Sequence, residues 1–211
     1  MPSPIAHSLM GAIFYRFGDK GSALSWRKFF YFIFCANVSD LDFIPGLFVG
    51  DVYRFHHGFS HSFLGSFLMA LFLHGIYQMC FKDNSWTGFG LVAGAVFSHP
   101  ILDLFVADPS APYGCPIFWP LTDARFISPI VFFARTSLRV SPFERINLLS
   151  YWIETVVFLP WVVIFYFLRS RKPRFVILGA VLSLLTIVYY GYTVEIKDGV
   201  IHFTRLLTGF L

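Results

Sequence analysis

Residues 63–81 read FLGSFLMALFLHGIYQMCF, an apolar run that contains no Asp, Glu, Lys or Arg. A helix that crosses a membrane needs about 20 mostly apolar residues, because its backbone bonds internally and only its side chains meet lipid. Three further stretches are long and apolar enough for the same role: 86–107, 148–168 and 175–194. The sequence therefore predicts four long spanning helices.

The composition agrees with a chain that is solvated by lipid. Of the 211 residues, 56% are hydrophobic and only 13% are charged, whereas soluble domains carry about 25% charged residues. The net charge is +4, and the basic residues lie in short loops between apolar runs instead of on one polar face. We therefore expect the lipid bilayer as partner and no nucleic acid. The composition does not indicate an oligomeric state.

The remaining segments complete the predicted fold class, an all-α polytopic membrane helical bundle that forms a single domain over residues 1–211. Two shorter apolar segments, 4–17 and 29–39, predict two short N-terminal helices. The stretch 108–147 holds six prolines. They are too closely spaced for a long helix, so we expect an ordered outer loop there.

Basic residues predict how the chain is oriented, because Lys and Arg in short loops stay on the cytoplasmic side. The densest basic loop, placed in the cytoplasm on this ground, holds Arg169, Arg171, Lys172 and Arg174. We then follow the chain from this loop toward the N-terminus, with one membrane crossing for each predicted helix. This places a set of ionisable residues at one depth, near the outer interface: His7, Asp40, Asp42, His57, His61, His99, Asp103 and Glu154. We therefore expect a multi-pass protein of the cell membrane (the inner membrane, if bacterial) with one site facing the outer side.

The stretch SHPILD, residues 98–103, is the strongest candidate motif. Ionisable groups in a membrane cost a few kcal/mol each, so they are usually paired or functional. His99 and Asp103 lie four residues apart and share a helix face. An imidazole beside a carboxylate suits Zn²⁺ or a similar divalent metal. The alternative is a hydrogen bond that merely satisfies two buried groups.

Three of the seven histidines lie in FHHGFSHS, residues 55–62: His56, His57 and His61. If the following helix already includes Gly58, His57 and His61 share a face. If it begins only at about Phe59, His56 and His61 converge instead. The alternative to a metal site is a pH-sensitive patch of histidines at the interface.

Asp40 and Asp42 follow an apolar segment in SDLDFIP, residues 39–45. Two carboxylates two residues apart cannot share a helix face, so this segment should turn just after the helix ends. Aspartates are also common in helix caps and turns. Glu154 lies among apolar residues, and its alternatives are a functional group or a salt bridge to Arg145. Asp40 and Glu154 are the candidate catalytic residues.

The candidate metal ligands outnumber the three or four that one catalytic zinc takes from a protein. They are His7, Asp40, Asp42, His56, His57, His61, His99 and Asp103. The expected cofactor is therefore one or two divalent ions, with zinc first. The chain contains no GxSxG, P-loop or HExxH motif, so serine-hydrolase, nucleotide-driven and zincin chemistry have no support.

The order of these motifs resembles the YdjM-like family, membrane-bound proteins described as metal-dependent hydrolases. The matching positions are His7, Asp40-Leu41-Asp42, His56 to Ser62, Ser98-His99 with Asp103, and Gly114 to Pro120 in GCPIFWP. The resemblance covers about residues 5–125. It implies His56 and His61 as the ligand pair, because the family usually has Arg where His57 stands. Two further departures are Ser39 and Phe43, where the family usually has Pro and His.

A more distant similarity is to the group of zinc-dependent phospholipase C and related nucleases, which cleave phosphodiesters. It implies that Asp40, His61, His99 and Asp103 bind one metal, that His7 helps to bind a second, and that a metal-held water is the nucleophile. The function expected from the sequence is thus a membrane-bound hydrolase of a phosphodiester or other ester in a lipid-like substrate. Two alternatives stay open: a transporter or channel lined by the His/Asp cluster, and a non-catalytic protein with a structural metal.

Overall fold

The computed structural model describes residues 3–18, 24–51, 54–107, 114–134, 136–137, 140–167, 172–197 and 200–205. These residues fall into two compact units. The histidine unit comprises His7–Leu102 and Gly114–Phe126, and the hairpin unit comprises Met1–Ala6, Asp103–Tyr113 and Ile127–Leu211. That the chain forms the one domain expected from its sequence stays a prediction.

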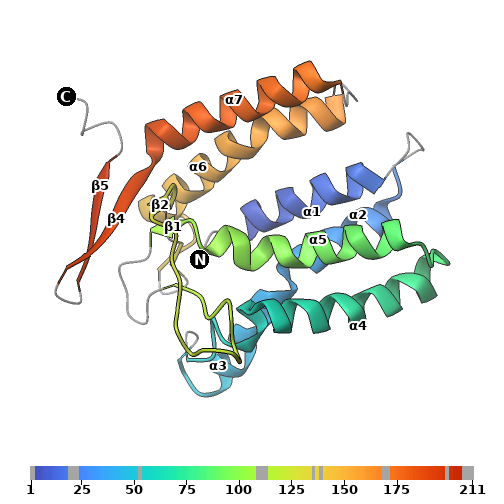
Figure 1. The fold of residues 1–211 in the computed structure, drawn as a ribbon, viewed down its shortest axis with the longest axis horizontal. Coiled ribbons are helices and arrows are strands. Elements are labelled where there is room, and N and C mark those ends of the chain that lie inside the picture. The colour runs from blue at the N-terminus through green and yellow to red at the C-terminus, as the bar shows by residue number, and fades with distance from the viewer. Residues whose placement is uncertain are drawn as a thin grey trace. The chain divides into compact units, whose positions relative to one another are not determined.

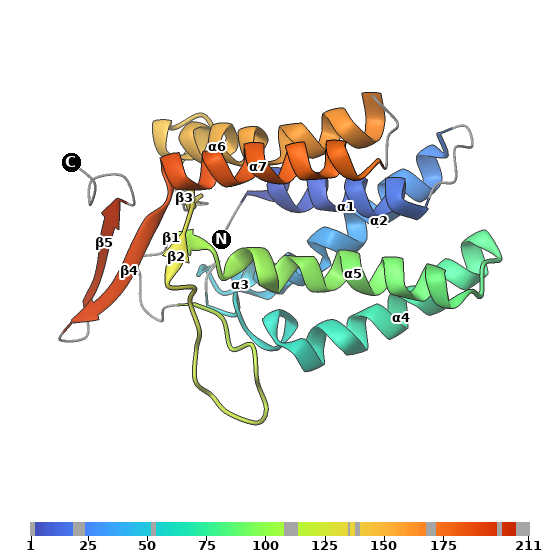
Figure 2. The ribbon, with the colours of Figure 1, turned by 45° about the horizontal axis from the view of Figure 1, so that its top comes forward.

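The histidine unit is a bundle of helices joined by short segments (Figures 1 and 2). Its elements are α1 (Pro4–Gly18, which begins in the hairpin unit), α2 (Trp26–Asn37), the 3-10 helix η1 (Val38–Phe43), α3 (Ile44–Phe48), the 3-10 helix η2 (Phe59–His61), α4 (Phe63–Phe81) and α5 (Trp86–Asp103, which ends in the hairpin unit). Four of these helices share one core. It is built from Tyr15 of α1, Phe32, Cys35 and Ala36 of α2, Ala70, Leu73 and Tyr77 of α4, and Val92, Ala95 and Val96 of α5.

Local signals explain where α4 begins and ends. The Ser62 hydroxyl accepts a hydrogen bond from the Gly65 N–H at 3.0 Å, which caps the first turn. Lys82 follows the last turn with a left-handed backbone (φ 53°), and its N–H bonds to the Gln78 carbonyl. The helix therefore covers the apolar run that the sequence predicted, from Phe63 to Phe81.

The hairpin unit pairs two long helices with a small sheet. Its helices are α6 (Arg145–Val162), continued by one π-helical turn at Val163–Phe167, and α7 (Pro173–Tyr190). Its strands are β1 (Val106–Ala107), β2 (Ile130–Val131), β3 (Phe133–Ala134), β4 (Tyr192–Lys197) and β5 (Val200–Arg205). β1 and β3 pair in parallel, and β2, β4 and β5 form an antiparallel sheet in that order. The Ser183 hydroxyl joins α7 to α6, because it donates to the Val157 carbonyl at 2.8 Å and accepts from Trp161 Nε1 at 3.0 Å.

Four helical segments are long and apolar enough to span a membrane: Trp26–Phe48, Phe63–Phe81, Arg145–Tyr166 and Pro173–Tyr190. Three of them confirm predicted spans. The fourth, Trp26–Phe48, exceeds the short helix predicted over 29–39, because η1 and α3 continue the winding of α2. The stretch 86–107 forms a helix that stops at Asp103 and is not among the four, since His99, Pro100 and Asp103 reduce its apolar character.

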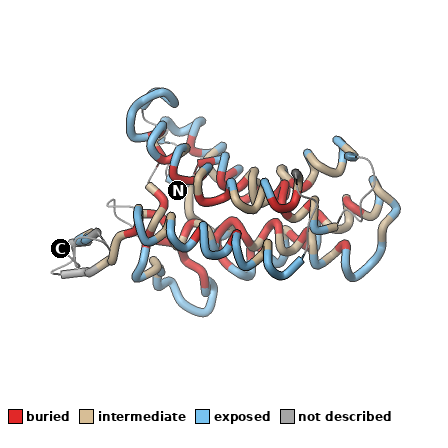
Figure 3. Tube along the Cα trace, turned by 90° about the horizontal axis from the view of Figure 1, so that it is seen from above, coloured by how far each residue is buried: buried red, intermediate tan, exposed pale blue. Residues whose placement is uncertain are grey.

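Many exposed residues on these helices are large and apolar. Figure 3 marks the exposed positions along the chain. On α7, Ile177, Leu184 and Leu185 are each more than half exposed. A soluble protein rarely leaves such continuous apolar surface uncovered. The polytopic helical membrane fold predicted from the sequence is therefore confirmed. Of the predicted loop, residues 108–113, 135, 138 and 139 lie outside the described residues, as do Arg169 and Arg171 of the basic loop.

Candidate metal centre

The two aspartates lie on η1, directly after α2. We expected the chain to turn here, but it continues from α2 into six residues of 3-10 helix. The tighter winding still brings both carboxylates to the same group of histidines. Asp40 is buried, and its Oδ2 has no hydrogen-bond partner among the described residues.

The histidine-rich segment before α4 is a tight turn. His57 has a left-handed backbone (φ 57°), η2 covers Phe59–His61, and α4 begins only at Phe63. The alternative in which the helix includes Gly58 is therefore wrong. The other alternative, in which His56 and His61 converge, agrees with the structure. His57 lies nearby as well, with its ring centroid 4.8 Å from that of His61.

Asp42 joins these two histidines. The Nδ1 of His56 lies 2.9 Å from Asp42 Oδ1, and the Nδ1 of His61 lies 3.0 Å from Asp42 Oδ2. The Ser60 hydroxyl donates to the same Oδ2 at 2.6 Å. Because a carboxylate only accepts, each imidazole presents Nδ1–H to Asp42, and in the neutral ring the lone pair is then on Nε2. Such a carboxylate orients histidine ligands in many metal sites.

His99 is oriented in the same way by the backbone. Its Nδ1–H donates to the Ala36 carbonyl at 2.7 Å, near the end of α2. A carbonyl oxygen cannot donate, so in neutral His99 the lone pair is likewise on Nε2. His99 is fully buried, which keeps this arrangement away from water.

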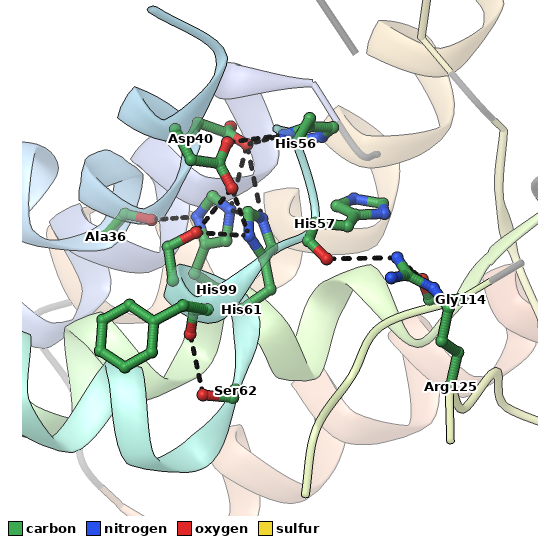
Figure 4. A network of polar contacts seen from close by, with 12 residues as sticks. Ala36, Asp40, His56, His57, His61, Ser62, His99, Gly114 and Arg125 are labelled. Carbon is green, nitrogen blue, oxygen red and sulfur yellow. Dashed lines mark hydrogen bonds and ion pairs between the residues drawn. The ribbon is translucent and has the colours of Figure 1, made fainter. Parts of the chain in front are cut away.

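Three acceptor atoms consequently face one another (Figure 4). His61 Nε2 lies 3.2 Å from His99 Nε2, and Asp40 Oδ1 lies 3.3 Å from His99 Nε2 and 3.7 Å from His61 Nε2. Without an ion, the imidazoles pair with Asp40 only when they are protonated, whereas a divalent cation at the centre of the triangle contacts all three atoms while the imidazoles stay neutral. The edges of a tetrahedral zinc site measure about 3.3 Å, as follows from Zn–N bonds of about 2.0 Å. The triangle fits such an ion.

Further imidazoles surround the triangle. His7 of α1 is fully buried and stacks on His99, with 3.7 Å between ring centroids and 15° between ring planes. Two sets could each hold a metal with one ligand atom per residue: His7, Asp40 and His99, and His56, His57 and His61. The structure thus brings seven of the predicted site residues together in the histidine unit: His7, Asp40, Asp42, His56, His57, His61 and His99.

Asp103 and Glu154 belong to the hairpin unit. Asp103 is the buried last residue of α5, four residues after His99, and its role as a ligand stays a prediction. Glu154 of α6 is fully buried and binds the start of α1: its Oε1 accepts the Ser3 N–H at 2.7 Å, and its Oε2 accepts the Ala6 N–H at 3.3 Å. The hydroxyls of Ser3 and Ser150 donate to it as well. This helix cap is a third interpretation of Glu154, beside the catalytic group and the salt bridge to Arg145.

Arg125 is a residue that sequence reasoning missed. Its guanidinium donates to the Gly114 carbonyl at 2.8 Å and to the His57 carbonyl at 3.2 Å, as Figure 4 shows. Both acceptors have left-handed backbones. Arg125 therefore joins the segment after Gly114 to the histidine turn. The sequence signal for it is weak, because Arg125 is one of several arginines in the Pro-rich stretch 108–147.

Comparison with known proteins agrees with the motif order. A family model described as YdjM inner membrane protein matches residues 1–196. The resemblance inferred from the motifs is thus confirmed, and the match extends well beyond residue 125. Neither the comparison with curated proteins nor that with solved structures gives a match.

Proposed function

The chain belongs to the YdjM inner membrane protein family, and on this basis we propose that it is a membrane-bound metal-dependent hydrolase. One observation carries the proposal: the lone pairs of His61 Nε2, His99 Nε2 and Asp40 Oδ1 converge at 3.2 to 3.7 Å. These three residues would hold a divalent ion, most suitably zinc. His7 supports a fourth ligand position or a second ion.

A divalent metal held there would activate a water molecule and polarise an ester oxygen. The residues of the chain contribute the rest of the centre. Asp42 and the Ala36 carbonyl orient the two imidazoles, and the buried surroundings exclude competing water. Arg125 holds the turn that carries His56 and His57.

Apolar side chains near these residues support a lipid-like substrate. Leu41 on η1, Phe55 and Phe59 beside the histidines, and Trp119 on the segment after Gly114 are all exposed. Phe59 and Trp119 pack edge to face, with ring centroids 5.4 Å apart. An amphiphile could place its head group at the polar cluster and its acyl chains against these residues. We propose that the reaction takes place at the outer membrane interface. This part of the proposal rests on the basic loops, which are expected on the cytoplasmic side.

The test is turnover by purified full-length protein. We expect a generic phosphodiester such as bis(p-nitrophenyl) phosphate, or the phosphodiester of a phospholipid, to be hydrolysed by the zinc-loaded protein. A chelator should abolish the reaction, and zinc should restore it. Tightly bound metal without turnover of any phosphodiester or carboxylic ester would instead favour a structural metal.

A transport function is the second candidate, and one observation favours it. Asp40 and Asp42 lie where the candidate span Trp26–Phe48 changes from α-helix to 3-10 helix. Interrupted helices with acidic residues form the ion sites of many transporters. Proteoliposomes distinguish the two candidates: zinc-dependent ion flux without hydrolysis would select transport, and hydrolysis without flux would select the enzyme.

Replacing Asp42 tests the orienting role. In the Asp42→Asn protein, the amide has a single acceptor oxygen for the two imidazoles and no charge. We expect zinc affinity to fall by about 10–100-fold without complete loss, as is typical when a group that only orients a ligand is removed. Competition with a fluorescent zinc chelator measures the affinity. An unchanged affinity would show that Asp42 does not orient the ligands.

A further inference from the structure

A second polar site lies at the other end of the histidine unit. A cavity of about 470 Å³ lies among four helix ends and their connections, and the lining residues that matter here are Lys28, Tyr77, Asp83, Ser85, Thr87 and Gly88. Thr87 is in the first turn of α5, whereas His99 is near its end. Twelve residues of helix separate the two by about 18 Å. The described lining of the cavity therefore shares no residue with the metal cluster, and the cavity goes beyond the proposed hydrolase site. The end of α4 and the start of α5, which contribute to it, are on the right in Figure 1.

Of the described residues that line this cavity, Lys28 is a cation and Asp83 is an anion. The Nζ of Lys28 lies over the rings of Tyr77 and Phe81, 5.7 and 5.5 Å from their centroids. Asp83 accepts the Ser85 N–H at 3.0 Å and the Tyr77 hydroxyl at 3.3 Å. Hydrogen bonds from Ser85, with a smaller contribution from the charge of Lys28, lower the pKa of Asp83 below its usual value. Asp83 is thus ionised at neutral pH, and the wall of the cavity carries both signs of charge.

The start of α5 adds donors beside these charges. The Ser85 hydroxyl caps the helix by accepting the Gly88 N–H at 3.0 Å, and Thr87 adds a second hydroxyl. Gly88 also keeps the wall open, because a Cβ there would lie 3.2 Å from the Tyr77 ring and 3.4 Å from the Asp83 carboxyl carbon. Lys28 together with this helix start suits a phosphate group.

The cavity lies at the depth of lipid head groups. Lys28 is the third residue of the candidate span Trp26–Phe48, and Asp83 comes two residues after the span Phe63–Phe81 ends. Both spans therefore reach the membrane–water interface beside the cavity. Zwitterionic phospholipids present a phosphate and an amine at that depth.

We propose that this cavity binds a phosphate ester that carries a primary amine, the head-group chemistry of phosphatidylethanolamine. Lys28 and the start of α5 contact the phosphate, and Asp83 accepts hydrogen bonds from the ammonium. A quaternary amine fits less well, because it donates no hydrogen bond and needs open aromatic faces. Lys28 already covers the Tyr77 and Phe81 rings.

The experiment is lipid retention by the full-length protein in mild detergent, read by native mass spectrometry. The probes are phosphatidylethanolamine, phosphatidylglycerol and phosphatidylcholine with identical acyl chains, and soluble O-phosphoethanolamine. We expect one phosphatidylethanolamine to be retained in preference to the other two lipids. Binding of O-phosphoethanolamine alone would also support the chemistry, but it would identify a soluble ligand as the source.

Variants separate this site from general lipid adhesion. Lys28→Gln should lower phosphatidylethanolamine retention by about tenfold, a loss of about 1.4 kcal/mol. Asp83→Asn should remove the preference over phosphatidylglycerol. Arg27→Gln is the matched control, since it removes the same charge from an exposed neighbour that does not line the cavity. The proposal would be refuted if the protein retained the three lipids equally. It would also be refuted if Lys28→Gln retained phosphatidylethanolamine as the wild type does, with an unchanged unfolding temperature as the control for folding. Neither outcome depends on metal content.

Discussion

The His61→Ala protein is expected to lose its bound divalent metal, whereas the wild-type protein should retain it near stoichiometry. His61 supplies one corner of the triangle and is tied to Asp42 at 3.0 Å. Its removal leaves two corners of the triangle and His7 as the candidate for a third ligand, so the site loses one of the ligands that hold the ion. The drop in zinc affinity should exceed the roughly 10–100-fold expected for Asp42→Asn. Elemental analysis of purified protein measures the metal, and phosphodiester turnover should fall to background in the same sample.

His74→Ala is the matched control for this experiment. His74 is another histidine of the same unit, but its Nε2 pairs with Gln78 on α4, and it belongs to no candidate metal group. Its replacement should leave metal content and turnover unchanged. If His61→Ala kept full metal content, the triangle would not be a metal site, and the hydrolase proposal would lose its basis.

The Glu154→Ala protein is expected to be less stable by about 3 kcal/mol. The substitution removes the buried acceptor of the Ser3 N–H and of the Ser3 hydroxyl, whereas the Ala6 N–H keeps the Ser3 carbonyl and the Ser150 hydroxyl keeps the Ala134 carbonyl. Each unsatisfied buried donor costs about 1–3 kcal/mol, and the loss of a helix cap typically costs about 1 kcal/mol. Unfolding in mixed micelles, followed by circular dichroism, measures the difference.

Glu154→Gln and Glu144→Ala make the result specific. Glutamine has the shape of glutamate, but its amide NH₂ would face the N–H groups at the start of α1 where the carboxylate accepted hydrogen bonds. Glu154→Gln should therefore also destabilise the protein. Glu144 precedes α6, is exposed and makes no side-chain cap, so its replacement should change stability by less than about 0.5 kcal/mol. Wild-type stability of Glu154→Gln combined with loss of turnover would instead support the catalytic role expected from the sequence.

Helix positions followed from sequence because they depend on local composition. The apolar run 63–81 became α4 with the same bounds, and 4–17 became α1 with one more residue. The strands β4 and β5 were not foreseen, and β4 begins at Tyr192, inside the helix predicted over 175–194, because α7 ends at Tyr190. Their pairing with each other and with β2 depends on partners that no local pattern reveals.

The sequence by itself determined that this is a helical membrane protein, because hydropathy and spacing act over one or two helical turns, and it predicted that its imidazoles and carboxylates share one depth. Only the tertiary structure decided how these groups are used. The Ala36 carbonyl sets the ring orientation of His99 across 63 residues of chain, and Glu154 meets Ser3 across 151. Such contacts depend on which helix faces pack together, and packing depends on the shapes of distant side chains, which spacing along the chain does not encode.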